Sequence, residues 1–258
     1  MLINAVIIIL REVLEASLIM GVLLALSQLN LLSRAWCIQA TLLGLVGAAL
    51  YAANIVVMSE MYGGIGQEII NVVLYTLIFV CILILLYSLN YQQQSKAIVL
   101  SMSGCVVVAI VREGSEIMVY IQGFLAIPQL LPTVLVGSSI GAGIGVSIGV
   151  FVYYLIVSLS SLSAIRFILL VLILIAGGMV SQATQMLLQA DLLPSQLPIW
   201  DTSGIISEQS LVGQILFAMM GYEATPTMLQ VIFYVLSILL TSFLAVKVVR
   251  RYQKISIV

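Results

Sequence analysis

Charged residues are scarce in this chain of 258 residues. Lys, Arg, Asp and Glu together make up 7% of the sequence, whereas an ordinary soluble domain contains about 25%. Apolar residues make up 63%. This composition excludes an ordinary soluble domain and indicates an integral membrane protein, which has the lipid bilayer as its surroundings and no nucleic acid as a partner.

Histidine is absent, and cysteine is rare. The three cysteines, Cys37, Cys81 and Cys105, lie in apolar stretches without paired spacing, where a thiol usually acts as a small buried hydrophobic group. Zinc and copper sites are built mainly from imidazole and thiolate ligands. The sequence therefore argues against such a site, and a metal bound by this chain would find mainly oxygen ligands.

Seven apolar runs are each long enough to cross a bilayer. A hydrocarbon core of about 30 Å needs roughly 20 helical residues, and the runs are too long for membrane-spanning strands. We therefore predict an all-α integral membrane protein with seven transmembrane helices. The first run carries charges and lacks a basic segment before it, so it is predicted to be a helix rather than a signal peptide. The predicted spans are Leu2–Leu29, Ala35–Met58, Ile69–Leu89, Ala97–Gln122, Thr133–Ser158, Ala164–Leu188 and Pro226–Val248.

The charges between the spans separate by sign. Acids lie in the connections between spans two and three and between spans six and seven: Glu60, Glu68, Asp191, Asp201, Glu208 and Glu223. Basic residues lie in or beside the other connections and the C-terminal tail: Arg34, Lys96, Arg166, Lys247, Arg250, Arg251 and Lys254. Because Lys and Arg accumulate on the cytoplasmic side, we predict that the N-terminus is outside and the C-terminus inside.

The remaining charges form the pattern Arg-Glu-x-x-Glu twice, within two of the spans. The first motif is Arg11–Glu15 and the second motif is Arg112–Glu116. Both lie roughly 14 to 15 Å from the outer ends of their helices, at a rise of about 1.5 Å per residue. In each motif the Arg and the two Glu share one helix face. Ionisable side chains at this depth are costly, so the pattern indicates a functional site.

The spacing of the motifs predicts an inverted repeat. The motifs lie 101 residues apart, each in the first helix of a three-helix group, and these two helices run in opposite directions. Transporters with such repeats bind substrate near the midplane, often where a helix is broken, and Gly114 is predicted to permit a break. The predicted layout of the single membrane domain is repeat one at 1–90, repeat two at 91–190, an external loop with a short amphipathic helix at 191–225, and the seventh helix with a cytoplasmic tail at 226–258.

The fifth span carries a stripe of glycines at four-residue spacing. Such a stripe lets another helix approach closely, so we predict that it serves packing rather than transport. The stripe consists of Gly137, Gly141, Gly145 and Gly149.

The two motifs offer a cation four carboxylates and two guanidinium groups, with a formal charge of -2. Carboxylate oxygens suit hard or borderline cations such as calcium, manganese and iron. Arg11 and Arg112 are predicted to balance the charge when the cation leaves. A competing interpretation is a set of buried ion pairs that lock the helices together, but two Glu would suffice for that. The predicted metal ligands are Glu12, Glu15, Glu113 and Glu116.

Three acids are predicted to lie at the external entrance of the site: Glu68, Asp201 and Glu223. They would gather cations from outside. The alternative is that they are external only because acids follow the topology of the chain.

Nearly the whole chain resembles the high-affinity iron permease family, which includes the fungal oxidase-dependent permeases and their bacterial counterparts. Arg11-Glu12-Val13-Leu14-Glu15 and Arg112-Glu113-Gly114-Ser115-Glu116 are similar to the family's two Arg-Glu-Gly-Leu-Glu motifs. Further similarity lies in Gln67-Glu68 and in the stretch from Trp200-Asp201 to Gly221-Tyr222-Glu223-Ala224-Thr225-Pro226. The chain departs from the family pattern at Val13, at Ser115 and at Asn71, where an acid is expected.

The resemblance implies a permease, not an enzyme, that imports iron across a plasma membrane or a bacterial inner membrane. Iron would be the transported substrate, without a prosthetic group. It would arrive in the ferric form after oxidation outside, from a partner ferroxidase or a periplasmic iron-binding protein. The oligomeric state is left open.

Two other functions remain as alternatives. One is an intramembrane ferroxidase at the carboxylates, although diiron sites in helical bundles commonly include His from Glu-x-x-His motifs, and this chain has no His. The other is a transporter of another hard divalent cation or of protons.

Overall fold

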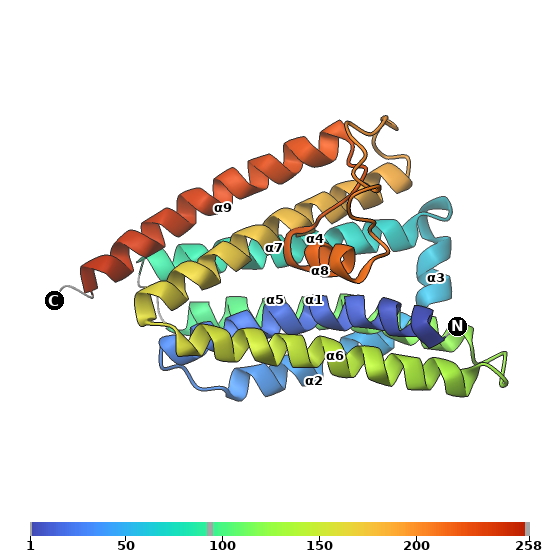
Figure 1. The fold of residues 1–258 in the computed structure, drawn as a ribbon, viewed down its shortest axis with the longest axis horizontal. Coiled ribbons are helices and arrows are strands. Elements are labelled where there is room, and N and C mark those ends of the chain that lie inside the picture. The colour runs from blue at the N-terminus through green and yellow to red at the C-terminus, as the bar shows by residue number, and fades with distance from the viewer. Residues whose placement is uncertain (1, 92–94, 256–258) are drawn as a thin grey trace.

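The computed structural model describes residues 2–91 and 95–255 of the chain. The predicted connection at 92–94 and the last three residues of the predicted tail lie outside the described residues. Within these residues the fold is all-α, as predicted (Figure 1). The helices are α1 (Leu2–Leu29), α2 (Ala35–Ala53), α3 (Ile55–Glu60), α4 (Gly66–Tyr91), α5 (Ser95–Gly123), α6 (Leu131–Ser158), α7 (Ser161–Gln189), α8 (Leu211–Met220) and α9 (Met228–Ile255), with a 3₁₀ turn, η1 (Met61–Gly63), before α4.

Six of the described helices are long and apolar enough to cross a membrane: α2, α4, α5, α6, α7 and α9. α1 has the bounds of the first predicted span and is as long as α6, at 28 residues. It carries the three charged residues of the first motif and is not one of the six. The predicted role of α1 as a further span stays a prediction.

The second predicted span is wrong at its outer end. The sequence predicts one helix over Ala35–Met58, but α2 ends at Ala53 and α3 begins at Ile55. Asn54 separates them, with φ -108° and ψ 12°, and its side-chain amide donates a hydrogen bond to the Leu50 carbonyl oxygen at 2.8 Å. An Asn side chain that competes for backbone acceptors in this way disfavours helix continuation. α3 consequently runs across the ends of the long helices (Figure 1).

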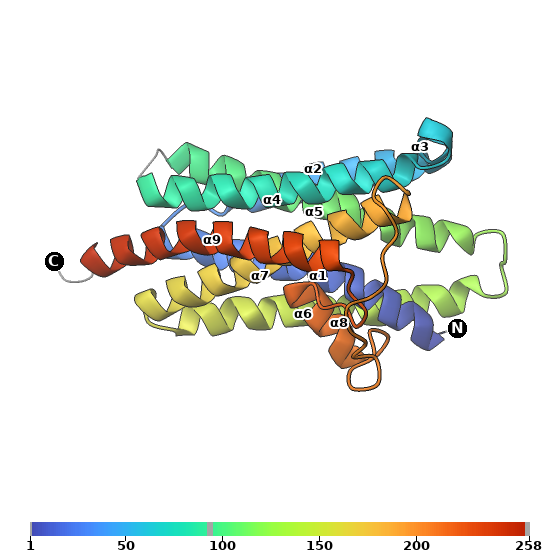
Figure 2. The ribbon, with the colours of Figure 1, turned by 90° about the horizontal axis from the view of Figure 1, so that it is seen from above.

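The long helices lie side by side in two layers, seen from two directions in Figures 1 and 2. One layer contains α4, α7 and α9, and the other contains α1, α2, α5 and α6. α1 packs along α6 and α2 packs along α5, while α7 packs on both α4 and α9. α1 also contacts α5. The two helices that carry the motifs are therefore direct neighbours.

The glycine stripe of α6 packs against α1, which confirms its predicted role. A Cβ atom added at Gly141 would lie 2.5 Å from the carbonyl oxygen of Val6, and one at Gly149 would lie 2.6 Å from Cβ of Ser17. Ser17 Oγ donates a hydrogen bond to the carbonyl oxygen of Gly145 at 2.8 Å. Side chains at these positions would push the two helices apart, so the stripe fixes α1 on α6.

The predicted break at Gly114 is wrong, because α5 is one continuous helix from Ser95 to Gly123. A Cβ atom at Gly114 would lie 3.0 Å from Cβ of Ala48 on α2. Gly114 thus allows α5 to pack closely on α2 and does not unwind the backbone.

The loop between α7 and α9, which is predicted to be external, contains the predicted short helix, α8. Ser210 caps its start, accepting a hydrogen bond on Oγ from the Gly213 amide at 3.0 Å, and Gly221 ends it with φ +66°. α8 packs against α1 and α7, one helix from each layer, and buries Phe217 and Ala218. The helix therefore dips between the layers.

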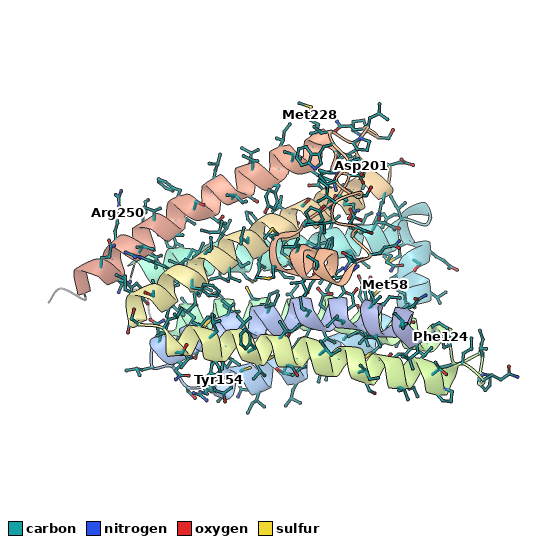
Figure 3. The ribbon with its side chains drawn as sticks, in the orientation of Figure 1. Met58, Phe124, Tyr154, Asp201, Met228 and Arg250 are labelled. Carbon is teal, nitrogen blue, oxygen red and sulfur yellow. The ribbon has the colours of Figure 1, made fainter. Side chains whose placement is uncertain are left out.

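Acidic and basic residues outside the motifs lie at opposite ends of the bundle. Figure 3 labels Arg250 near the end where the chain finishes, and Asp201 toward the end where it begins. We call these the C-terminal end and the N-terminal end. Arg34, Lys96 and Arg166 stand at or beside the starts of α2, α5 and α7, which lie at the C-terminal end. Which end faces outward stays a prediction.

Candidate functional site

The two motifs meet between α1 and α5, and Arg112 lies among their carboxylates. Its Nη1 atom is 2.5 Å from both Oε atoms of Glu113 and 3.3 Å from Oε2 of Glu15. The same atom is 3.7 Å from Oε2 of Glu12, and Nη2 is 3.0 Å from Oε1 of Glu116. We call these four Glu the carboxylate cluster. One guanidinium group thus pairs with every predicted metal ligand.

Arg11 has a different environment, although the two motifs have the same pattern. Its Nε atom lies 3.6 Å from Oε1 of Glu15, and its guanidinium carbon lies 3.8 Å from the ring centroid of Phe217 on α8. A cation over an aromatic ring is stabilised by the ring's quadrupole. The Arg11 side chain is 33% exposed, against 4% for Arg112. Arg112 is therefore the central counter-charge, and Arg11 lies at the rim.

The carboxylate cluster carries more negative charge than its two Arg residues neutralise. Glu12, Glu15 and Glu113 are buried, whereas the Glu116 side chain is 33% exposed. Oε2 of Glu12 and Oε1 of Glu15 are buried and have no hydrogen-bond partner within the described residues. Burying an ionised carboxylate is costly unless it is paired. Surplus charge, and oxygen atoms that have ion-pair contacts but accept no hydrogen bond, make this cluster suited to taking up a cation or protons.

The cluster carboxylates surround the guanidinium group of Arg112. In the part of the chain that the structure describes, no three His, Cys, Asp or Glu side chains are arranged to hold a metal ion. Arg112 lies among the four Glu, so a bound cation would have to displace it from some of its pairs. The arrangement therefore fits the predicted exchange between an arginine and a cation, while the four Glu stay predicted ligands.

A cavity of about 430 Å³ connects the cluster with the N-terminal end of the bundle. We call it the outer cavity. Glu68 is one of its lining residues, and the Oε2 atom of Glu68 is buried without a hydrogen-bond partner in the described residues. Among the residues that the structure describes, no Lys or Arg lines this cavity, so its surface attracts cations. Its polar and aromatic lining residues are Glu12, Tyr51, Gln67, Glu68, Asn71, Ser115, Glu116, Tyr120 and Gln189.

A second cavity, of about 280 Å³, lies beside α8, and we call it the side cavity. It shares Glu116 with the outer cavity, but both Arg11 and Arg112 also line it. Glu208 and Glu223 complete its charged lining. The side cavity thus mixes charges of both signs, in contrast with the outer cavity.

Glu223 is held in the side cavity, next to a second acid. Its Oε2 atom accepts a hydrogen bond from Nε2 of Gln230 at 2.5 Å. Burial and the nearby Glu208 raise the pKa of Glu223 to about 7. The charge of this side chain therefore changes near neutral pH.

Glu208 is a charged residue of the side cavity that the sequence does not single out. Its Oε1 atom accepts a hydrogen bond from the Ala224 amide at 2.6 Å, which joins the two ends of the α8 segment. The only signal in the sequence is an acid shortly before α8. Its position depends on how the loop folds.

Asp201 lines neither the outer cavity nor the side cavity. Its Oδ1 atom accepts hydrogen bonds from the amide and the hydroxyl of Ser203, at 2.8 and 2.5 Å. These bonds lower the pKa of Asp201. The structure brings two of the three predicted entrance acids, Glu68 and Glu223, to cavities at the cluster, and gives Asp201 a local role in a turn.

A third cavity, of about 570 Å³, reaches the cluster from the C-terminal end. We call it the inner cavity. Glu12 and Glu113 lie at one end and Arg34 at the other, while most of its lining is apolar. Glu12 lines both the outer and the inner cavity. The carboxylate cluster therefore separates two cavities that open toward opposite ends of the bundle.

Comparison with known proteins identifies the family of the chain. No curated protein and no solved structure matches the chain at a significant level. A sequence model described as the iron permease FTR1 family matches residues 2–257, nearly the whole chain. The match includes both motifs and all the helices described above. The chain therefore belongs to the iron permease FTR1 family.

Proposed function

We propose that this protein imports iron across a plasma membrane or bacterial inner membrane, and that the carboxylate cluster binds the ion on its way. The proposed substrate is ferric iron, produced outside by a partner ferroxidase or delivered by an iron-binding protein. The family supports iron transport. The observation that carries the site is the contact of Arg112 with all four cluster carboxylates.

The proposed architecture is a seven-span inverted repeat in which α1 is the remaining span. In the proposed repeat, α1 corresponds to α5, α2 to α6, and α4 to α7. The contact of α1 with α6 therefore corresponds to the contact of α5 with α2, and both contacts are extensive in this fold. The contacts of α1 with α5 and of α4 with α7 map onto themselves. This symmetry of contacts supports the repeat.

The charges support a route through the cluster. In the proposed orientation the N-terminal end is outside, so a cation first enters the outer cavity, whose described lining contains no basic residue. At the cluster, carboxylate oxygens replace its water, and Arg112 gives up part of its pairs. Hard cations such as iron prefer such oxygen ligands. When the ion leaves, Arg112 pairs again with the carboxylates, so the site is never left with all its charge exposed.

Uptake of radiolabelled iron into proteoliposomes tests this function. We expect iron to accumulate in vesicles that contain the protein and not in empty vesicles. Ferrous and ferric iron, each with and without an imposed proton gradient, would identify the oxidation state and the driving force. Failure to move either form would contradict the proposal, as would oxygen consumption with ferrous iron in the absence of a partner, which would indicate a ferroxidase.

Iron uptake is expected to fall as the external pH is lowered through about 7, where Glu223 titrates. A raised pKa means that this carboxyl becomes neutral just below pH 7, so the side cavity loses one negative charge beside Glu208 and Arg11. The loss should be at most about five-fold, since a partly exposed charge contributes about 1 kcal/mol or less. Initial rates measured with one iron chelate across the pH range would show it.

In the Glu223→Gln variant, iron uptake at every pH should be as low as wild-type uptake below pH 7, and the pH dependence should disappear. Glu60→Gln, a change in an exposed acid at the same end, is the control and should keep the wild-type profile. A Glu223→Gln variant with an unchanged pH profile would mean that Glu223, in the side cavity, does not influence iron uptake.

A further inference from the structure

The inner cavity is a groove between α2 and α6 that is open at its side. Four of its apolar and aromatic lining residues are also 45 to 65% exposed: Leu45, Val146, Val150 and Tyr154. α2 packs on α5 and α6 packs on α1, with no substantial contact between α2 and α6 themselves. Because α2 and α6 are long enough and apolar enough to cross a membrane, the open side of the groove faces lipid.

We propose that this groove binds one acyl chain of an anionic phospholipid, whose phosphate group pairs with Arg34. The groove ends at Glu12 and Glu113, so the lipid site adjoins the carboxylate cluster, but lipid binding can be tested without iron and does not require that the protein transports it. Three features of the groove support this occupant: its depth, the charge at its mouth and the apolar character of its wall.

The depth of the groove matches one leaflet of a bilayer. Arg34 directly precedes α2, and Leu45 lies eleven residues further along, which corresponds to about 16 Å of helix. Half of a hydrocarbon core is about 15 Å thick. A chain that enters beside Arg34 would therefore end near Glu12 and Glu113, at the level of the motifs.

No carboxylate of the described residues pairs with the charge at the mouth. The described ion pairs all involve Arg11 or Arg112, and none involves Arg34. Nη2 of Arg34 donates to the neutral Oε1 of Gln28 at 3.0 Å, and Tyr153 donates to the same oxygen. These bonds fix the guanidinium at the mouth and leave its other N–H groups for phosphate oxygens. Basic residues between helices on the cytoplasmic side commonly bind anionic headgroups.

The wall of the groove suits an acyl chain better than an ion. Ser17 has one of the few hydroxyl groups in it, and this hydroxyl donates to the carbonyl oxygens of Leu14 and Gly145 at 3.1 and 2.8 Å. A hydrated cation would find few oxygen ligands between the cluster and Arg34. An acyl chain would instead cover apolar surface and keep water from the inner side of the carboxylates.

Native mass spectrometry of the full chain, titrated with phosphatidylglycerol or with phosphatidylcholine of the same acyl chains, tests the headgroup. We expect one phosphatidylglycerol to bind about five-fold more tightly, because a basic residue near a membrane surface contributes about 1 kcal/mol. Arg34→Gln should remove this preference. Arg250→Gln, an exposed charge at the same end but on α9 in the other layer, should keep it (Figure 3). The proposed site would be overturned if both variants changed the preference for phosphatidylglycerol equally, or if Arg34→Gln left it unchanged.

A second pair of variants tests the acyl chain. Val146→Phe fills the groove and should weaken both lipids, whereas Val136→Phe, equally exposed on α6 but outside the cavity, should not. If inorganic phosphate displaced phosphatidylglycerol at a similar concentration, the acyl chain would not contribute to binding, which would contradict the proposal. If Val146→Phe instead turned a dimer into a monomer without loss of lipid, the groove would be an interface between two copies of the chain.

Discussion

Replacing Glu15 or Glu116 by glutamine is expected to abolish iron uptake while leaving the amount of protein in the membrane near normal. Each change preserves the shape of the side chain and removes one of the four charges that would hold the ion. The loss should be at least about 10- to 100-fold, since changes beyond the ligands themselves already have that effect at metal sites. Uptake of radiolabelled iron, divided by the amount of protein on an immunoblot, measures it.

The positions of Glu15 and Glu116 differ in burial, so the two variants test different parts of the carboxylate cluster. Glu15 is buried and contacts both Arg residues, whereas Glu116 is partly exposed and lines the outer and side cavities. Arg112 keeps its closest partner, Glu113, in both variants, so neither should unfold the protein. Glu60→Gln controls for the loss of an external acid. Uptake that survives both substitutions would remove the central claim about the cluster.

The course of the helices could largely be predicted from the sequence, because apolar run length determines what can cross a bilayer. α1 begins and ends at the predicted residues, and the glycine stripe of α6 packs as its spacing predicts. The break at Asn54 could not be predicted in this way. Ile55 to Met58 continue the apolar run, and hydropathy reports the preference for lipid, not the direction of the backbone.

The role of Gly114 could not be predicted from the sequence either. A glycine within a membrane helix fits either an unwound backbone or a close helix contact, and the sequence alone does not distinguish them. Its neighbour Ala48 lies on a helix far away in the sequence. The contact between α2 and α5 shows that Gly114 serves close helix packing.

The sequence predicts that the two motifs lie close together, and the structure shows this, but the different surroundings of the two arginines could not be predicted. The motif pattern is the same in both copies, so the sequence treats Arg11 and Arg112 alike. α8 breaks this symmetry, since it has no counterpart in the predicted repeats and brings Phe217 over Arg11. Glu208 was missed for a related reason: its position depends on the fold of the α8 segment.

This asymmetry leads to the second large prediction, for Arg112. Arg112→Gln should strongly reduce the amount of folded protein, because it leaves three buried carboxylates without their common partner. Removing one member of a buried ion pair typically costs about 3 to 5 kcal/mol. Arg11→Gln should cost far less, since its side chain is 33% exposed and contacts Glu15 at 3.6 Å. Size-exclusion profiles and thermal unfolding of the purified variants compare the two.

A double variant separates folding from transport. Arg112→Gln with Glu113→Gln removes one charge of each sign from the closest pair in the cluster, so the amount of folded protein should recover toward normal. Iron uptake should stay low, because the variant lacks both a cluster carboxylate and the guanidinium that pairs with the others when the ion leaves. Recovery of uptake together with folding would mean that Arg112 and Glu113 only hold α5 in place. Low uptake in well-folded protein would instead mean that the pair of Arg112 and Glu113 serves transport as well as folding.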